Sequence, residues 1–165
     1  MSSLGARVPR HWLRRAAAAL IGGCAAYQLM LGAYFVAFRP PLLPEDLRFL
    51  GTSAMRHVVD LARLERWLDL VFMVLGGQMA ALGVLLAAFA VRLARRTSWD
   101  RSEPILLGIA GVLSVALMSA VNFALGSNFR WLLILPVLAW SIGVVLAALG
   151  SGASSTKAGV RLHAE

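Results

Sequence analysis

The side chains best suited to acid–base or metal chemistry lie in one segment, residues 39–69. They are two adjacent acids and, further along, an imidazole and a carboxylate: Glu45, Asp46, His57 and Asp60. His57 and Asp60 are one helical turn apart, so both could face one way. Two ligands do not complete a structural zinc site, which needs four. We therefore expect no metal, no cofactor and no catalytic residue, and regard the four as a candidate extracytoplasmic cap site.

A second set of polar residues lies inside long apolar stretches. Its members are three amides and one hydroxyl: Gln28, Gln78, Asn122 and Ser119. With a rise of about 1.5 Å per residue, the three amides fall within roughly 6–14 Å of the same end of these stretches. They form a candidate intramembrane polar cluster. It could consist of hydrogen bonds between helices or line a polar cavity.

Ionisable side chains are absent from these apolar stretches, and this excludes several classes of protein. Proton- and cation-coupled transporters usually carry such a group within a span. Small multidrug exporters need an acid in their first span, and quinone-linked thiol oxidoreductases need cysteine pairs, whereas Cys24 is the only cysteine. No Walker loop, Rossmann fingerprint or GxSxG motif occurs in the sequence.

The elements that hold these residues are predicted from the distribution of charge. Hydrophobic residues make up 59% of the chain, above the roughly 45–50% of soluble domains. Charges leave four gaps, each longer than the about 20 residues that cross a bilayer as a helix. We predict an all-α fold, a four-helix transmembrane bundle. The expected spans are about 16–38, 70–92, 105–126 and 131–150, followed by a flexible cytoplasmic tail over 151–165.

The stretch RPPLLPEDLRFLG, residues 39–51, predicts a helical cap between the first two spans. Pro40 and Pro41 end the first helix because proline lacks an amide donor. Pro44 suits the first position of a new helix, and acids follow it in the first turn. Gly51 favours a stop. We expect a second cap helix after Gly51, capped by Thr52 or Ser53.

Basic residues predict the orientation, because positive charge near span ends stays cytoplasmic. Ten of the sixteen basic residues lie in the N-terminal tail, the loop over 92–103 and the C-terminal tail. We expect the inner membrane of a bacterium, with both termini cytoplasmic and residues 39–69 outside. The net charge is +8, but the basic residues flank the spans and form no long basic run. This distribution argues against nucleic-acid binding.

The first span has an alternative interpretation. The residues IGGC, ending at Cys24, resemble the lipobox of bacterial lipoproteins, in which residues 1–23 would be removed and the cysteine lipidated. The apolar run before Cys24 is near the lower limit for a signal peptide, and the run continues well beyond the cysteine. An uncleaved helix is the favoured interpretation.

Small residues spaced four apart predict close contacts between helices, most clearly at the Gly76–Gly77 pair with Ala80 and Ala81. Pro136 is expected to kink the fourth span or to be absorbed by a local adjustment.

The segment FRPPLLPEDLRFLG, followed by VFMVLGGQMAALGVLLAA, resembles uncharacterised small bacterial four-span membrane proteins over about the middle third of the chain. This resemblance brings no site residues with it. The leading hypothesis is a non-enzymatic accessory or scaffolding protein that lies in the lipid bilayer and binds a membrane-protein partner through its helices or cap. One alternative is a small homo-oligomeric transporter or channel for a neutral or polar solute. The other is a membrane enzyme acting on a lipidic substrate.

Overall fold

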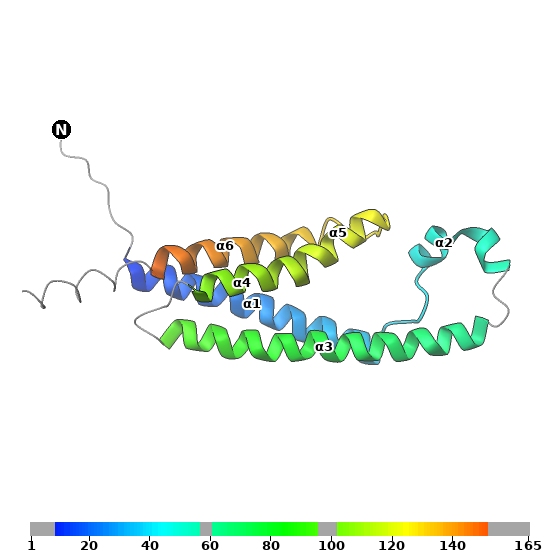
Figure 1. Cartoon of the computed structure of the whole chain (residues 1–165), viewed down its shortest axis with the longest axis horizontal. Coiled ribbons are helices and arrows are strands. Elements are labelled where there is room, and N and C mark those ends of the chain that lie inside the picture. Colours follow the sequence, from blue (N-terminus) through cyan, green and yellow to red (C-terminus); the bar gives the residue numbers. More distant parts are fainter. Residues whose placement is uncertain (1–8, 57–60, 96–101, 152–165) are drawn as a thin grey trace, which may run out of the picture.

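The computed structural model describes residues 9–56, 61–95 and 102–151, and every regular element in these ranges is a helix (Figure 1). In chain order the helices are α1 (Arg10–Ala37), α2 (Pro44–Arg56), α3 (Leu61–Arg95), α4 (Ser102–Gly111), η1 (Val112–Ala116), α5 (Leu117–Ala124) and α6 (Ile134–Ser151). The segment η1 is a turn of π-helix, and α4, η1 and α5 follow one another without a break.

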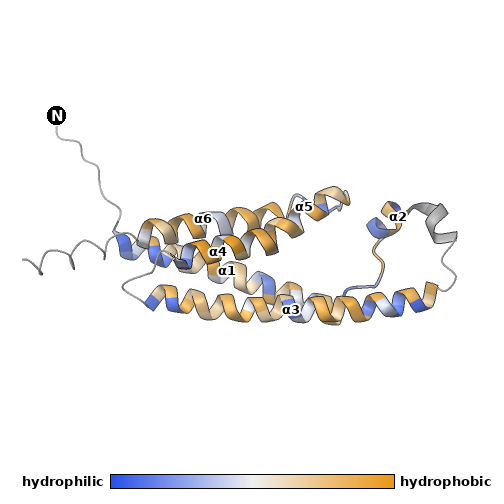
Figure 2. Ribbon diagram, in the orientation of Figure 1, coloured by the Kyte–Doolittle hydropathy of each residue, from blue (hydrophilic) through white to orange (hydrophobic). Residues whose placement is uncertain are grey.

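Among the described residues, three helical segments are long and apolar enough to cross a membrane: α1, α3 and the rod formed by α4, η1 and α5. The fourth apolar helix, α6, is shorter, at 18 residues. Apolar residues run along all of them, and hydrophilic residues gather at the start of α1 and at both ends of α3 (Figure 2). The prediction of an all-helical, membrane-type chain is thus confirmed for the described residues.

The helices α1 and α3 lie side by side and form the most extensive helix pair. Small buried residues recur every seven positions on both: Ala18, Ala25 and Gly32 on α1, and Gly76, Gly83 and Ala90 on α3. A Cβ atom on Gly32 would lie 2.6 Å from the carbonyl oxygen of Gly76, and one on Gly76 would lie 2.7 Å from that of Gly32. A seven-residue repeat keeps one face of a helix against its neighbour, and small residues let the two backbones approach.

The helix α6 packs against both α1 and α4. Gly143 of α6 lies over Ile21 of α1, where a Cβ atom would come within 3.0 Å of the side chain. On the α4 side, the buried indole of Trp140 occupies the space that Gly111 leaves open. Its Nε1 donates a hydrogen bond to the carbonyl oxygen of Leu107 at 2.9 Å, so the buried donor is satisfied.

The main hydrophobic core gathers side chains from α1, α3, α4, η1 and α6. Its buried members are Ile21, Cys24, Ala25, Leu86, Ala90, Leu107, Val115 and Trp140. They lie toward the end of the molecule where α1 begins and α3 ends, here called the arginine-rich end. Toward the opposite end, which α2 occupies and which we call the cap end, the α1–α3 pair separates from α5 and α6 (Figure 1).

The local predictions for the cap are confirmed over its described residues, and the expectation for Pro136 changes. The helix α2 begins at Pro44, and Gly51, with φ 72° and ψ 159°, breaks its helical path. A second helical stretch follows the break and continues to Arg56, as expected after Gly51. Residues 57–60 lie outside the described residues, and α3 begins at Leu61. Pro136 lies in the first turn of α6 and needs no kink, since an amide there has no intrahelical acceptor.

Candidate functional site

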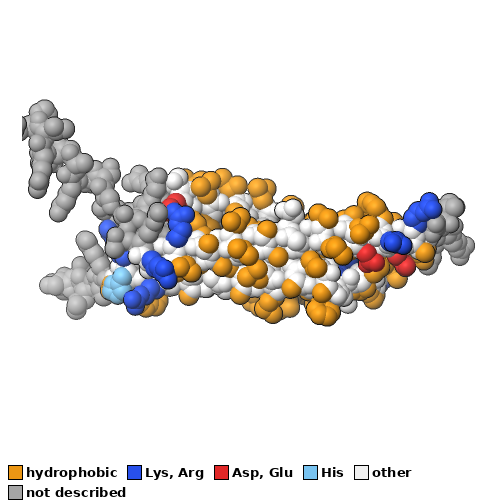
Figure 3. Space-filling model, turned by 90° about the horizontal axis from the view of Figure 1, so that it is seen from below, with side chains coloured by type: hydrophobic (Ala, Val, Ile, Leu, Met, Phe, Trp, Pro, Cys, Tyr) orange, Lys and Arg blue, Asp and Glu red, His pale blue; other side chains and the backbone are white. Residues whose placement is uncertain are grey.

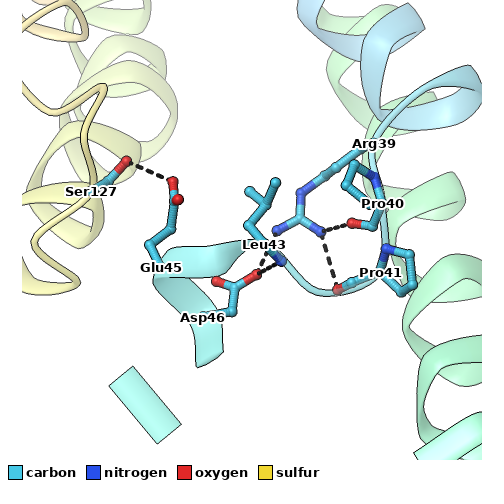
Figure 4. Close-up of polar contacts among 7 residues, drawn as sticks. All are labelled: Arg39, Pro40, Pro41, Leu43, Glu45, Asp46 and Ser127. Carbon is cyan, nitrogen blue, oxygen red and sulfur yellow. Dashed lines mark hydrogen bonds and ion pairs between the residues drawn. The ribbon is translucent and has the colours of Figure 1, made fainter. Parts of the chain in front are cut away.

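The turn between α1 and α2, residues 39–46, is the most highly connected polar region of the described structure, and we call it the elbow. Arg39 lies at its centre (Figure 4). The guanidinium carbon is 3.4 Å from the ring centroid of Phe72 on α3 and 5.2 Å from that of Phe35 on α1. Both distances are within the range of cation–π attraction. Arg39 therefore ties the end of α1 to α3 just beyond the first apolar stretch.

The same guanidinium also holds the proline-rich chain in place. Its Nη1 donates hydrogen bonds to the carbonyl oxygens of Pro40 at 3.0 Å and Pro41 at 3.5 Å, and its Nη2 lies 3.4 Å from Oδ2 of Asp46. Only 9% of the Arg39 side chain is exposed. Burial lowers the pKa of this guanidinium, and the nearby Asp46 carboxylate opposes that shift. Arginine remains protonated in proteins nonetheless, so the contact carries a full charge.

Asp46 has a second role, at the beginning of α2. Its Oδ2 accepts a hydrogen bond from the backbone amide of Leu43 at 2.9 Å, while the carbonyl of Leu43 accepts from the amide of Asp46 at 3.0 Å. The bond from the Leu43 amide is one half of a capping box, in which the side chain of the third helical residue satisfies the amide before the helix. The other half is absent because leucine has no side-chain acceptor, and the backbone carbonyl of Leu43 accepts from Asp46 instead. The acids expected in the first turn of this helix are present, and one of them also fixes its direction.

Glu45 connects the elbow to a distant part of the chain. Its Oε1 accepts a hydrogen bond from Oγ of Ser127 at 3.3 Å, and both residues are buried (Figure 4). Ser127 lies just after Gly126, whose φ of 64° follows the end of α5, and Oγ of Ser127 also accepts from the amide of Phe129 at 3.2 Å. The elbow thus bridges the α1–α3 pair and the α5–α6 turn.

The carboxylates of the proposed cap site are therefore engaged in structural contacts. Glu45 bonds to Ser127, and Asp46 bonds to Arg39 and Leu43. His57 and Asp60 lie outside the described residues. Among the residues that are described, no three His, Cys, Asp or Glu side chains gather as metal ligands would. The contacts of the elbow can hold helices in position.

The four residues of the candidate intramembrane cluster occupy different environments. Gln28 is 2% exposed, and its Oε1 has no hydrogen-bond partner. Ser119 is buried, and Asn122 is half-buried with its Nδ2 donating to the carbonyl oxygen of Met118 on its own helix at 2.9 Å. Gln78 is exposed on α3. Within the described ranges, no hydrogen bond joins any two of these side chains.

Gln78 belongs to an exposed face of α3 that is turned away from α1. The face consists of Gly77, Gln78, Ala81, Leu85 and Ala88, all of them exposed. A Cβ atom on Gly77 would have no neighbour within 4 Å, in contrast to one on the adjacent Gly76. The side-chain amide of Gln78 has no hydrogen-bond partner in the part of the chain that the structure describes.

A shallow groove of about 290 Å³ runs between the π-helical turn and α6. Its walls are glycine, alanine and valine with the indole of Trp140, and its one hydroxyl, that of Ser141, already donates to the carbonyl oxygen of Val137 at 2.8 Å. This composition suits an acyl chain or an apolar side chain and offers no polar group for catalysis.

Cys24 is buried inside α1, and its Sγ lies 3.8 Å from the carbonyl oxygen of Pro136 on α6. Ala17, Ala18 and Ile21, which precede it, are buried in the two hydrophobic clusters of the structure. Removal of residues 1–23 would therefore delete part of the packed interior.

Sequence reasoning overlooked the partners that give the elbow its contacts. Arg39 follows Phe35 by one helical turn, and this spacing is a local signal that could have been used. Phe72 and Ser127 carry no such signal, because Ser127 is 82 positions from Glu45 and only the fold brings them together.

Comparison with known proteins finds no relative of this chain. The chain matches no protein-family model, and no curated protein or solved structure is significantly similar to it.

Proposed function

We propose that this chain is a non-enzymatic accessory or scaffolding subunit that binds a transmembrane helix of a partner protein through the exposed face of α3. In this proposal it lies in a bacterial inner membrane as a four-helix transmembrane bundle. The arginine-rich end and both termini are cytoplasmic, and α2 forms part of an extracytoplasmic cap. Figure 3 shows the apolar surface over the middle of the molecule, with basic residues at the arginine-rich end and charges of both signs at the cap end.

The exposed amide of Gln78 is the observation that carries the proposal. It lies nine residues after Asp69, the last charge before the apolar part of α3, which places it roughly 13 Å into that part. An amide moved from water to hydrocarbon without a hydrogen-bond partner costs roughly 4–8 kcal/mol. A neighbouring helix could supply that partner, and Gly77 and Ala81 would let its backbone come close.

The partner is expected to be another protein rather than a second copy of this chain. Arg92 and Arg95 continue the exposed face of α3 at its end, and both are exposed. A parallel second copy docked on the same face would bring these four arginines together, and like charges in contact oppose association. No contact in the described structure favours the transport alternative, because the three amides are not joined to one another.

A photo-crosslinking amino acid at position 81 tests the proposal in native membranes. The matched control carries the same residue in place of Ala120, which is also exposed but lies on α5. We expect one protein to crosslink at position 81 and not at position 120. The yield should fall by about threefold with Gln78→Leu, because an interhelical hydrogen bond in a membrane is worth about 0.6 kcal/mol.

Three results would overturn this proposal. Crosslinks only between copies of this chain would indicate a homo-oligomer and return transport to consideration. Crosslinks only to lipid would mean that the face has no protein partner. A crosslinking yield that Gln78→Leu leaves unchanged would show that the partner binds without the Gln78 amide.

A further inference from the structure

The arginine-rich end carries a dense group of exposed basic side chains, beyond the five residues of the proposed partner face. Arg10 and Arg15 lie on the first two turns of α1, and Arg92 and Arg95 lie on the last turn of α3, all four exposed. Figure 3 shows Lys and Arg side chains clustered at this end of the molecule. The only acidic side chain at this end, among the described residues, is that of the half-buried Glu103.

Helix packing brings three of these arginines to one level. Ala17 and Ala18 of α1 and Leu93 of α3 belong to one buried cluster, so the turns before Ala17 and around Leu93 lie beside each other. Arg15 therefore stands at the height of Arg92 and Arg95. Each of these three guanidinium groups is a planar fork of donors that matches the oxygen atoms of a phosphate.

Exposed apolar side chains neighbour the basic groups in sequence. Trp12, 59% exposed, lies between Arg10 and Arg15 in sequence, and Val91, 48% exposed, precedes Arg92. Tryptophan favours the boundary between headgroups and hydrocarbon. A ligand at this rim would place its anionic group on the guanidinium groups and its apolar part along α1 and α3.

We infer that Arg10, Arg15, Arg92 and Arg95 form a binding rim for the headgroups of anionic phospholipids. A lipid suits the rim better than a free anion, because the charges sit directly at the end of the apolar surface of two membrane-type helices. The inference is independent of the partner proposed for Gln78, since it needs only the charges and the adjoining apolar surface.

Native mass spectrometry of the full chain in detergent, with equal amounts of phosphatidylglycerol and phosphatidylcholine, tests the rim. We expect phosphatidylglycerol to be retained preferentially. Arg92→Gln with Arg95→Gln should lower that preference on the order of tenfold, because each basic group near a membrane surface contributes to anionic-lipid binding. Arg92→Lys with Arg95→Lys keeps both charges and should retain most of it.

The matched control is Arg48→Gln with Arg66→Gln, which removes two exposed arginines from the cap end. It should leave the preference unchanged. An equal loss of the phosphatidylglycerol preference in this control would show that only net charge matters. It would contradict a binding site at the rim. Absence of any preference in the unaltered chain would do the same, and displacement of the lipid by inorganic phosphate would show a plain anion site instead. A helical circular dichroism spectrum for each variant confirms that it is folded.

Discussion

Arg39 combines contacts that are usually distributed over several residues. One guanidinium packs between two aromatic rings, bonds two proline carbonyls and pairs with the carboxylate that caps α2. Because the side chain is largely buried, water competes weakly for these contacts, and the pair is worth more than an exposed salt bridge. Arg39 thus links the elbow to α3.

The first prediction replaces this arginine. Arg39→Gln should lower the free energy of unfolding by about 2 kcal/mol, through the lost cation–π contacts and the unpaired Asp46. Arg39→Lys should recover only part of the loss, since an ammonium group lacks the planar fork. Denaturant unfolding in mild detergent measures both. Arg48→Gln, at an exposed position of α2, is the control, and an equal effect there would contradict the role given to Arg39.

The second prediction concerns the bond between Glu45 and Ser127. A double-mutant cycle with Glu45→Ala and Ser127→Ala should give a coupling energy of about 1 kcal/mol, typical of a buried hydrogen bond. Glu45→Gln keeps an acceptor oxygen and should cost less than Glu45→Ala. A coupling energy indistinguishable from zero would mean that the elbow and the α5–α6 turn are energetically separate.

Among the helices, the α1–α3 pair depends on close approach of the two backbones. Gly76 faces α1, whereas Gly77, its neighbour in sequence, faces away. A methyl group can be accommodated at one and not at the other, because a Cβ at position 76 would meet a backbone carbonyl that cannot move aside.

The third prediction uses this adjacent pair. Gly76→Ala should destabilise the chain by about 1–3 kcal/mol, while Gly77→Ala should change its stability by less than about 0.5 kcal/mol. Thermal unfolding of the two purified variants in the same detergent gives the comparison. Equal effects of the two substitutions would argue against the packing of α1 on α3 through Gly32 and Gly76.

For the whole molecule, the distribution of arginine predicts how the chain lies in a membrane. In a Cys24→Ser background, Arg48→Cys should react with a membrane-impermeant maleimide added to intact cells, and His11→Cys should react only after the cells are opened. The two positions lie at opposite ends of the described structure, on α2 and at the start of α1. Labelling in the reverse order would invert the proposed topology.

The state of the N-terminus follows from the core. Ala17, Ala18 and Ile21 are packed against other helices, so we expect the protein isolated from its membrane to retain residues 1–23 and an unmodified Cys24. Intact-mass spectrometry checks this. A mass matching a chain that begins at a diacylated Cys24 would support the lipoprotein alternative and would require α1 to pack differently.

Several features of this protein follow from local sequence. Runs of apolar residues must form helices in lipid because their backbone groups have no other partners, so the helical class is predictable from charge spacing. The start of α2 at Pro44 and the break at Gly51 follow from the covalent limits of proline and glycine. The acids after Pro44 suit the beginning of a helix because the helix dipole places partial positive charge at its first turn, which is also a local effect.

Tertiary structure alone decided which helices pair and which polar groups meet. The sequence contains many small residues at helical spacing, and only packing distinguishes the buried Gly76 from the exposed Gly77. Whether Gln28, Gln78 and Asn122 meet depends on helix rotation, which a span prediction does not contain. Rotation is set by the summed contacts of whole faces, and Glu45 finds Ser127, 82 positions away, only once those faces have packed.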